Sequence, residues 1–339
     1  MNYYPIIIPT LNRYEHFKRC VESLANNTHA NQTELVIGLD YPPDDKFEEG
    51  YKKIKTYIPT IKGFAKVTVF EHEKNLGPRD NNICLINYCK AKYEAFIATE
   101  DDNVFSPGFL DYINKTLELY WDDENILTIS GYNFEDAYNQ GEYTYYLSQD
   151  NCGWGIALWN HKEDRLKKVL DNYDYFREAL KNRQKAKKII NTYPALYQML
   201  NGMVKRNLRW GDVMRTTINI LEDTYQLRPA ISLVKNCGYD GSGIHCGNND
   251  VFGLSLQKIS DATSFDFGIG LGPAETPINK EALYNHCLSK DIATKEKQLQ
   301  TIKKIYYYNT NPLYRTYHIV RQKLAIRTRL RNLLKYLLK

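Results

Sequence analysis

The sequence predicts an α/β protein in which a mainly parallel sheet is covered by helices on both faces. Within residues 1–131, short apolar runs alternate with amphipathic segments. Continuous apolar runs are typical of strands buried on both faces, and helices between them indicate a doubly wound, parallel arrangement. In such sheets ligands bind beyond the carboxyl ends of the strands, so residues that follow strands are the first candidates for function.

Five runs are predicted to be strands because they are rich in Ile, Val, Leu, Phe and Thr and are bounded by polar or turn-forming residues. They cover residues 3–9, 34–39, 66–71, 94–99 and 125–130. Segment 13–26, between the first two runs, is predicted to be a helix, because apolar residues recur there at helical spacing. These residues are Phe17, Cys20, Val21 and Leu24.

Length and composition are those of an ordinary folded protein. Of 339 residues, 43% are hydrophobic and 25% are charged, which excludes a fibrous or disordered chain. The seven cysteines are odd in number and show no CxxC spacing, so we expect reduced thiols in a cytoplasmic protein rather than disulfides or a zinc site. The first residues lack a basic segment and a long apolar run, so we expect neither a signal peptide nor a membrane span.

Charge is divided unevenly along the chain, although the net charge is only +5. Residues 297–339 contain eleven Lys and Arg residues and no Asp or Glu, so the preceding part is net acidic. We therefore predict one domain over residues 1–296 and a basic tail over 297–339. A Lys- and Arg-rich helical pattern at about 160–207 is interpreted as an insertion within the domain.

The tail is predicted to form an amphipathic helix, with Asn311 as its cap and Pro312 at its first position. Its apolar side contains Ile326, Leu330, Leu333, Leu334, Leu337 and Leu338, and its basic side contains Arg327, Arg331 and Lys335. Such a helix suits an anionic membrane surface, where each basic residue contributes about 1 kcal/mol. We therefore expect peripheral contact with the inner face of the membrane. The alternative is a helix that packs on an acidic body or partner.

Three adjacent carboxylates, Glu100, Asp101 and Asp102, follow the predicted strand at 94–99. Charge runs are most often solvated turns. Here, however, the preceding strand is predicted to be buried, and its carboxyl end is the ligand-binding edge of the sheet. Carboxylates at such an edge hold Mg²⁺ or Mn²⁺ together with phosphate oxygens. The cluster therefore predicts a divalent metal that carries a nucleoside diphosphate.

Several motifs resemble the glycosyltransferases of the GT-A fold. The segments IIIPTLNRYEHFKRCVESL, LVIGLD and NLGPRDNN are similar to the first elements of family-2-like members. EDDNVFSPGFLDYI is similar to the EDD motif of the alpha-mannosyl beta-1,2-N-acetylglucosaminyltransferase type. Its later landmarks follow in the same order, as ISGYN, CGWGIALW, WGDVMR, RPAIS and CGYDGSGIHCG. The resemblance covers roughly residues 5–250 and implies a Rossmann-like GT-A fold. Departures from that type are the long helical segment, the lack of an N-terminal anchor and the basic tail.

The resemblance implies roles for the acidic cluster and its surroundings. Asp102 would bind the metal directly, Asp101 would act through water or the ribose, and Glu100 would contact the ribose or the donor sugar. Pro9, which ends the first predicted strand, and Arg79, in NLGPRDNN, would belong to the nucleotide site.

Two further residues are candidates from their own chemistry. Arg13 suits bidentate contact with a phosphate, and Asp40, which ends the second strand, can accept a hydrogen bond from uracil or ribose. The alternatives are an ordinary surface arginine and a turn aspartate.

Asp212, in WGDVMR, matches the general base of the inverting enzymes. The attacking acceptor hydroxyl must lose a proton, and a placed base contributes about 10²–10⁴-fold. The alternative is an aspartate at a helix start. His245 lies in a Gly-rich turn and is a candidate metal ligand, although a lone histidine is more often structural. Trp154, between two glycines, would line the sugar site or be a buried core residue.

These observations predict a metal-dependent, inverting glycosyltransferase. It would move a sugar from a nucleotide-diphosphate donor, with UDP favoured, to a hydroxyl of a glycan or lipid-linked acceptor in surface polysaccharide or glycoconjugate synthesis. One alternative, a sugar nucleotidyltransferase, would need a Gly-rich loop after the first strand, and PTLNRYEH contains no glycine. The other is a noncatalytic scaffold attached to a membrane or partner through the tail. The tail lacks base-stacking modules, so we expect no nucleic-acid partner.

Overall fold

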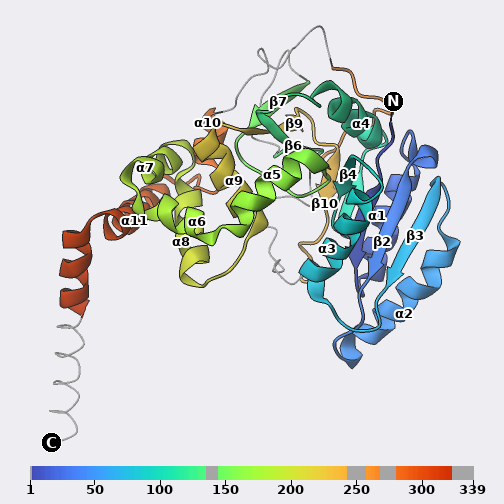
Figure 1. Ribbon diagram of the computed structural model, residues 1–339, viewed down its shortest axis with the longest axis horizontal. Coiled ribbons are helices and arrows are strands. Elements are labelled where there is room, and N and C mark those ends of the chain that lie inside the picture. Colours follow the sequence, from blue (N-terminus) through green and yellow to red (C-terminus); the bar gives the residue numbers. More distant parts are fainter. Residues whose placement is uncertain (1, 135–143, 243–256, 268–279, 323–339) are drawn as a thin grey trace, which may run out of the picture. The chain divides into compact units, whose positions relative to one another are not determined.

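The computed structural model describes residues 2–134, 144–242, 257–267 and 280–322. The chain divides into two compact units, each described separately below (Figure 1). The first comprises Met1–Lys168 and Asp223–Ala282, and the second comprises Val169–Glu222 and Leu283–Lys339.

The first unit contains an eight-stranded sheet with the order β3-β2-β1-β4-β8-β6-β9-β7 (Figure 1). The strands are β1 (Ile6–Thr10), β2 (Glu34–Leu39), β3 (Lys66–Glu71), β4 (Ala95–Ala98), β6 (Ile126–Ser130), β7 (Tyr145–Ser148), β8 (Ile156–Trp159) and β9 (Tyr225–Pro229). All pairs among β1, β2, β3 and β4 are parallel, as is β6 with β9. β8 and β7 run antiparallel to their neighbours. The predicted mainly parallel α/β sheet is confirmed.

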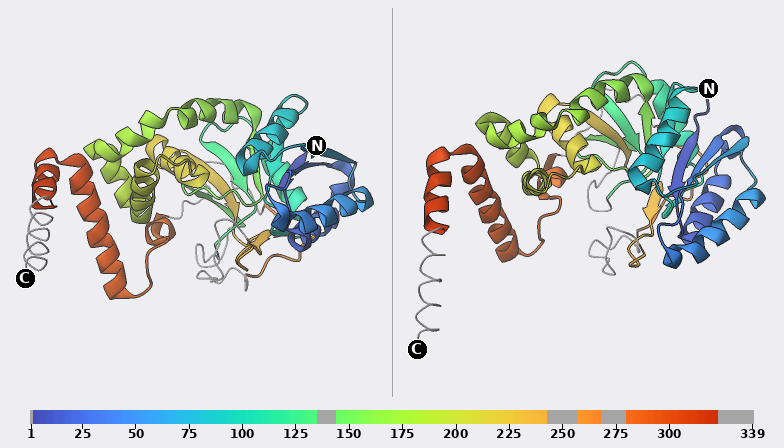
Figure 2. Two further views of the ribbon diagram at one scale, coloured as in Figure 1. Left: turned by 90° about the horizontal axis from the view of Figure 1, so that it is seen from below. Right: turned by 60° about the horizontal axis from the view of Figure 1, so that its bottom comes forward.

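Helices cover both faces of this sheet (Figure 2). They are α1 (Tyr14–Ala25), α2 (Glu48–Tyr57), α3 (Gly77–Lys90) and α4 (Phe109–Leu119). Successive strand residues point to opposite faces. Ile6 and Ile8 accordingly pack in the core that includes residues of α1, α2 and α4, whereas Ile7 packs with Leu85 of α3. Burial on both faces explains why β1 and β2 are mostly apolar, whereas the edge strand β3 is only partly buried.

A second, two-stranded sheet joins distant parts of the first unit. β10 (Val234–Asn236) pairs antiparallel with β5 (Asn103–Phe105), so that Asn236 lies opposite Asn103. No local sequence pattern predicted that this segment pairs with β5. This pairing places the chain after β9 beside the acidic cluster.

The second unit is helical. Its helices include α6 (Tyr173–Lys181), α7 (Arg183–Thr192), α8 (Pro194–Lys205), α9 (Gly211–Glu222) and α11 (Ile292–Thr310), while α5 (Asn160–Asp171) begins in the first unit and α10 (Lys280–Asn285) spans the second boundary. Asn309 of α11 bonds to the Tyr197 hydroxyl at 3.3 Å and to Asn201 Oδ1 at 3.2 Å, which joins α11 to α8. The segment interpreted as an insertion therefore forms helices that pack with a helix of the predicted tail.

The predicted cap of the tail helix is confirmed. Asn311 Oδ1 accepts hydrogen bonds from the backbone amides of Leu313 at 3.0 Å and Tyr314 at 3.2 Å, and residues 312–322 are helical. The apolar and basic faces predicted from Ile326 onward lie outside the described residues. Of the helices that the structure describes, none is both long and apolar enough to span a bilayer.

Candidate active site

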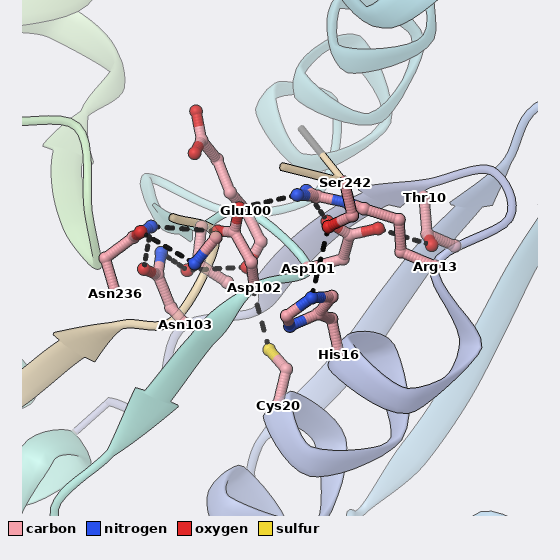
Figure 3. Close-up of polar contacts among 12 residues, drawn as sticks. Thr10, Arg13, His16, Cys20, Glu100, Asp101, Asp102, Asn103, Asn236 and Ser242 are labelled. Carbon is pink, nitrogen blue, oxygen red and sulfur yellow. Dashed lines mark hydrogen bonds and ion pairs between the residues drawn. The ribbon is translucent and has the colours of Figure 1, made fainter. Parts of the chain in front are cut away.

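The acidic cluster lies just beyond the carboxyl end of β4 (Figure 3). Asp101 and Asp102 are each only 4% exposed, whereas Glu100 is exposed. A solvated turn is therefore excluded for the two aspartates. Burying carboxylates is costly unless they are paired and hydrogen-bonded, so their partners decide what the site can do.

Arg13 pairs with both aspartates. Its Nη1 donates to Asp102 Oδ2 at 2.8 Å, and its Nη2 donates to Asp101 Oδ1. Thr10 Oγ1 donates to the other Asp101 oxygen at 2.9 Å. Because β1 and β4 are parallel neighbours, their carboxyl ends meet at one edge, which brings these residues together.

The ionisation of this group follows from burial and charge. Burial raises the pKa of Asp101, and the neighbouring Asp102 acts in the same direction, while Arg13 opposes both. Burial alone would lower the pKa of Arg13, but the two carboxylates outweigh it and raise that pKa. One guanidinium thus faces two carboxyl groups, and a bound cation would favour their charged forms.

The remaining Asp102 oxygen faces β10. Asn236 Nδ2 donates to Asp102 Oδ1 at 2.9 Å, and the backbone amide of Cys237 donates to the Asp102 carbonyl at 2.9 Å. A Cβ atom on Gly238 would lie 2.2 Å from Asp102 Oδ2, so a side chain at that position would require Asp102 to move. The Asp102 side chain is therefore held from several sides.

A divalent metal fits the chemistry of these donors. A carboxylate has about four acceptor positions, and the hydrogen bonds to Asp102 use two of them. Within the described residues, no cluster of three or more His, Cys, Asp or Glu side chains could hold a metal ion. The protein would thus supply one or two carboxylates and the diphosphate further oxygens, as is usual for Mg²⁺. The candidate ligand His245 lies outside the described residues.

Asp40, at the end of β2, fixes the start of α3. Its Oδ1 accepts the backbone amides of Tyr41 at 2.9 Å and Leu76 at 2.8 Å. Its Oδ2 accepts Gly77 N at 2.9 Å and Asn75 Nδ2 at 3.2 Å. These four bonds match the acceptor capacity of a carboxylate, so a nucleotide would have to share or displace one of them. Its role in nucleotide binding remains a prediction.

Three other predicted donor-site residues are also in the first unit. Pro9 is half-buried in β1, and Arg79 is exposed in the first turn of α3. Trp154 is half-buried, with its ring centroid 4.7 Å from that of Tyr132 and 6.5 Å from that of Tyr239. Trp154 thus has both an exposed part and a core contact, which suits either interpretation of it.

The predicted base Asp212 belongs to the second unit. It is exposed in the first turn of α9, where an aspartate is favourable because of the helix dipole. The role of Asp212 as a base remains a prediction.

Sequence reasoning missed several residues of this region, among them His16. His16 Nε2 lies 2.8 Å from Asp240 Oδ2, and Arg19 Nη2 lies 2.8 Å from Nδ1. Because arginine can only donate, the hydrogen-bond network assigns the proton to Nε2. His16 of α1 therefore forms a hydrogen bond to Asp240 in the segment after β10. Of the missed residues, only Thr10 had a local signal, since it directly follows the predicted strand 3–9.

A mainly parallel sheet with buried carboxylates at the carboxyl edge of a central strand is the architecture of the GT-A glycosyltransferases. Residues 6–190, more than half of the chain, match the profile of Glycosyl transferase family 2. The chain therefore belongs to glycosyl transferase family 2 and is a glycosyltransferase. Among curated proteins, none matches the sequence.

Solved structures similar to this chain include the mannosyltransferase PcManGT from Pyrobaculum calidifontis in complex with GDP-Man and Mn²⁺. It is 12% identical with a TM-score of 0.34, over 65% of this chain and 74% of that one. TarS from S. aureus is 14% identical with a TM-score of 0.36, over 60% of this chain and 43% of its own. TarS 1–349 in complex with UDP is 14% identical with a TM-score of 0.34, over 52% of this chain and 53% of its own. The chain thus spans about half or less of these two TarS chains.

Proposed function

We propose that this glycosyltransferase moves a sugar from a nucleoside-diphosphate donor to a hydroxyl of a glycan or lipid-linked acceptor, with Mn²⁺ or Mg²⁺ as cofactor. The observation that carries the proposal is the pair of buried aspartates, Asp101 and Asp102, that face one guanidinium at the ligand-binding edge. The EDD motif favours UDP as the nucleotide and supports a donor sugar of the hexose or N-acetylhexosamine class.

The residues of the first unit would divide the work of binding the donor. Asp102 would hold the cation, which, when bound, stabilises the charge that develops on the leaving diphosphate. Arg13 would contact a phosphate, for which its planar group is suited. Thr10 would keep Asp101 in place. Glu100 would contact the ribose or the sugar.

Further donor contacts and the transfer step are proposed from the motifs. Pro9, Asp40 and Arg79 would border the nucleotide, and Trp154 would line the sugar site. Asp212 would take the proton of the acceptor hydroxyl, and attack opposite the diphosphate would invert the anomeric centre. His245 would be a further metal ligand.

We also propose peripheral contact with the inner face of a membrane through the basic tail. In the described part of the tail, Leu313, Tyr317 and Val320 are 83%, 59% and 50% exposed and recur at helical spacing. Residues 297–339 contain eleven basic residues and no acidic ones, which suits anionic lipids. Binding of the chain to vesicles with and without anionic lipid tests this contact, and equal binding to both would contradict it.

Donor turnover tests the catalytic proposal. Purified chain would be incubated with UDP-sugars and Mn²⁺, and release of UDP would be measured for wild type, Asp102→Asn and the control Asp122→Asn. Asp122 is exposed and precedes β6, at the opposite edge of the sheet from the site. We expect wild type and the control to release UDP and Asp102→Asn to lose most of this activity. Equal rates in all three would refute the assigned site, and the scaffold alternative would gain support if no donor reacted.

A further inference from the structure

We infer that Asn236 is a positioning residue for the metal site. This inference rests on the proposed function, because Asn236 contacts the Asp102 carboxylate that would hold the cation. Asn236 is 2% exposed and comes from β10, far from the acidic cluster in the sequence. Figure 3 shows its amide directed at Asp102 and Asn103.

The hydrogen bonds of Asn236 fix the orientation of its amide. Nδ2 donates to Asp102 Oδ1 at 2.9 Å and to Asn103 Oδ1 at 3.0 Å, so both amide hydrogens are used. Oδ1 accepts the backbone amide of Gly238 at 3.0 Å. Rotating the amide by half a turn would place a donor against the Gly238 N–H and an acceptor against a carboxylate. The network therefore permits one orientation, with the donor toward Asp102.

The backbone around Asn236 makes this contact rigid. Asn236 pairs with Asn103 across the β10–β5 ladder, and Cys237 N bonds to the Asp102 carbonyl at 2.9 Å. The Gly238 Cα approaches Asp102 so closely that a Cβ there would lie 2.2 Å from Oδ2. Asn236 thus restrains one oxygen of the carboxylate, while Arg13 restrains the other at 2.8 Å.

Restraint of a ligating carboxylate matters for metal affinity. Hydrogen bonds to a ligand orient it before the metal binds, and removal of such a partner typically weakens metal affinity by about 10- to 100-fold. A neutral amide suits this task because it holds the oxygen without adding a charge that would compete with the cation. Asn236→Ala would release Asp102 Oδ1 without altering the predicted ligand itself.

The test is titration calorimetry of Mn²⁺ into the full chain in the presence of UDP, together with the melting temperature of each variant. Asn236→Ala is compared with Asn114→Ala. Asn114 is a matched control because it is also buried, at 1% exposure, and joins Leu110 O to Tyr4 N through its amide. We expect Mn²⁺ affinity to fall about 10- to 100-fold in Asn236→Ala only, although the melting temperature of both variants is lowered.

A partly conservative variant keeps the test decisive. Asn236→Ser retains one hydroxyl donor, and it is expected to keep more Mn²⁺ affinity than Asn236→Ala. It also serves if the alanine variant does not fold. Equal Mn²⁺ affinity in wild type, Asn236→Ala and Asn236→Ser would overturn the inference while leaving the proposed function intact. If wild type itself bound neither Mn²⁺ nor UDP, the proposed function would fail first.

Discussion

The Arg13 guanidinium lies 2.8 Å from Oδ2 of Asp102, although the two residues are 89 positions apart in the sequence. The same side chain also pairs with Asp101. The Arg13 side chain is 19% exposed, whereas the side chains of Asp101 and Asp102, taken without their backbone, are 6% and 5% exposed. A single arginine from the segment between β1 and α1 therefore balances part of the charge of two aspartates after β4. Their mutual dependence gives the first prediction.

Replacing Arg13 by alanine is expected to reduce both stability and nucleotide binding. Loss of one partner leaves buried carboxylates uncompensated, which costs about 3 kcal/mol. Urea unfolding measures this cost. Arg165→Ala is the control, because Arg165 pairs with Glu124 with side chains 48% and 63% exposed, and such pairs contribute about 1 kcal/mol or less. A cost for Arg13→Ala no greater than that for Arg165→Ala would contradict the assigned pairing.

Asp40→Asn is expected to lower the free energy of unfolding by about 2 kcal/mol. The amide group of asparagine cannot accept all four bonds, which come from Tyr41, Asn75, Leu76 and Gly77, so partly buried donors lose their partner. Asp44→Asn, at the exposed start of a short helix, should cost less. Chemical denaturation measures both variants. A stable Asp40→Asn protein that no longer binds UDP would instead assign Asp40 mainly to the ligand.

Glu34 predicts a dependence of stability on pH. Burial raises its pKa, but hydrogen bonds from Thr68, Tyr93, Tyr88 and Lys66 outweigh burial and lower it from 4.5 to about 2. Because the folded pKa lies below the unfolded one, the stabilisation is complete above pH 4.5 and is lost as pH falls through about 2.

Unfolding of wild type and Glu34→Gln at pH 6 and pH 3 measures this contribution. We expect the wild type to lose more stability between the two pH values than Glu34→Gln does, by about 1–2 kcal/mol. Glu118→Gln, at an exposed position of α4, is the control and should behave like wild type. If Glu34→Gln and wild type respond equally to pH, the hydrogen-bonded carboxylate is not the cause.

The sequence predicted the parts of the site that depend on local patterns. Strands 34–39 and 66–71 were predicted with their observed bounds, and the first strand, predicted at 3–9, is Ile6–Thr10. The first two runs are mostly apolar because β1 and β2 are covered on both sheet faces, whereas the edge strand β3 is only partly buried. The carboxylates after β4 follow from the position of that strand. The partners of those carboxylates were harder to predict.

Contacts between distant segments had no local signal. Asn236 lies 134 positions from Asp102, and its place was decided by the antiparallel pairing of β10 with β5. The Gly, Asn and Asp residues of the segment after β9 are typical of turns. Two of these residues, Asn236 and Gly238, lie against Asp102. Likewise, the bonds from Asp40 to the start of α3 had no local signal, because the amides that it binds come 36 and 37 positions later. Its role in nucleotide binding stays a prediction.

The most direct test of the central claim is Mn²⁺-dependent binding of UDP to the full chain, measured by calorimetry beside GDP and CDP. We predict that wild type and Asp122→Asn bind UDP in the presence of Mn²⁺, and that Asp102→Asn loses at least about tenfold in affinity because a metal ligand is missing. Binding of UDP that is unaffected by Mn²⁺ and by Asp102→Asn would contradict a metal–diphosphate site at this edge of the sheet.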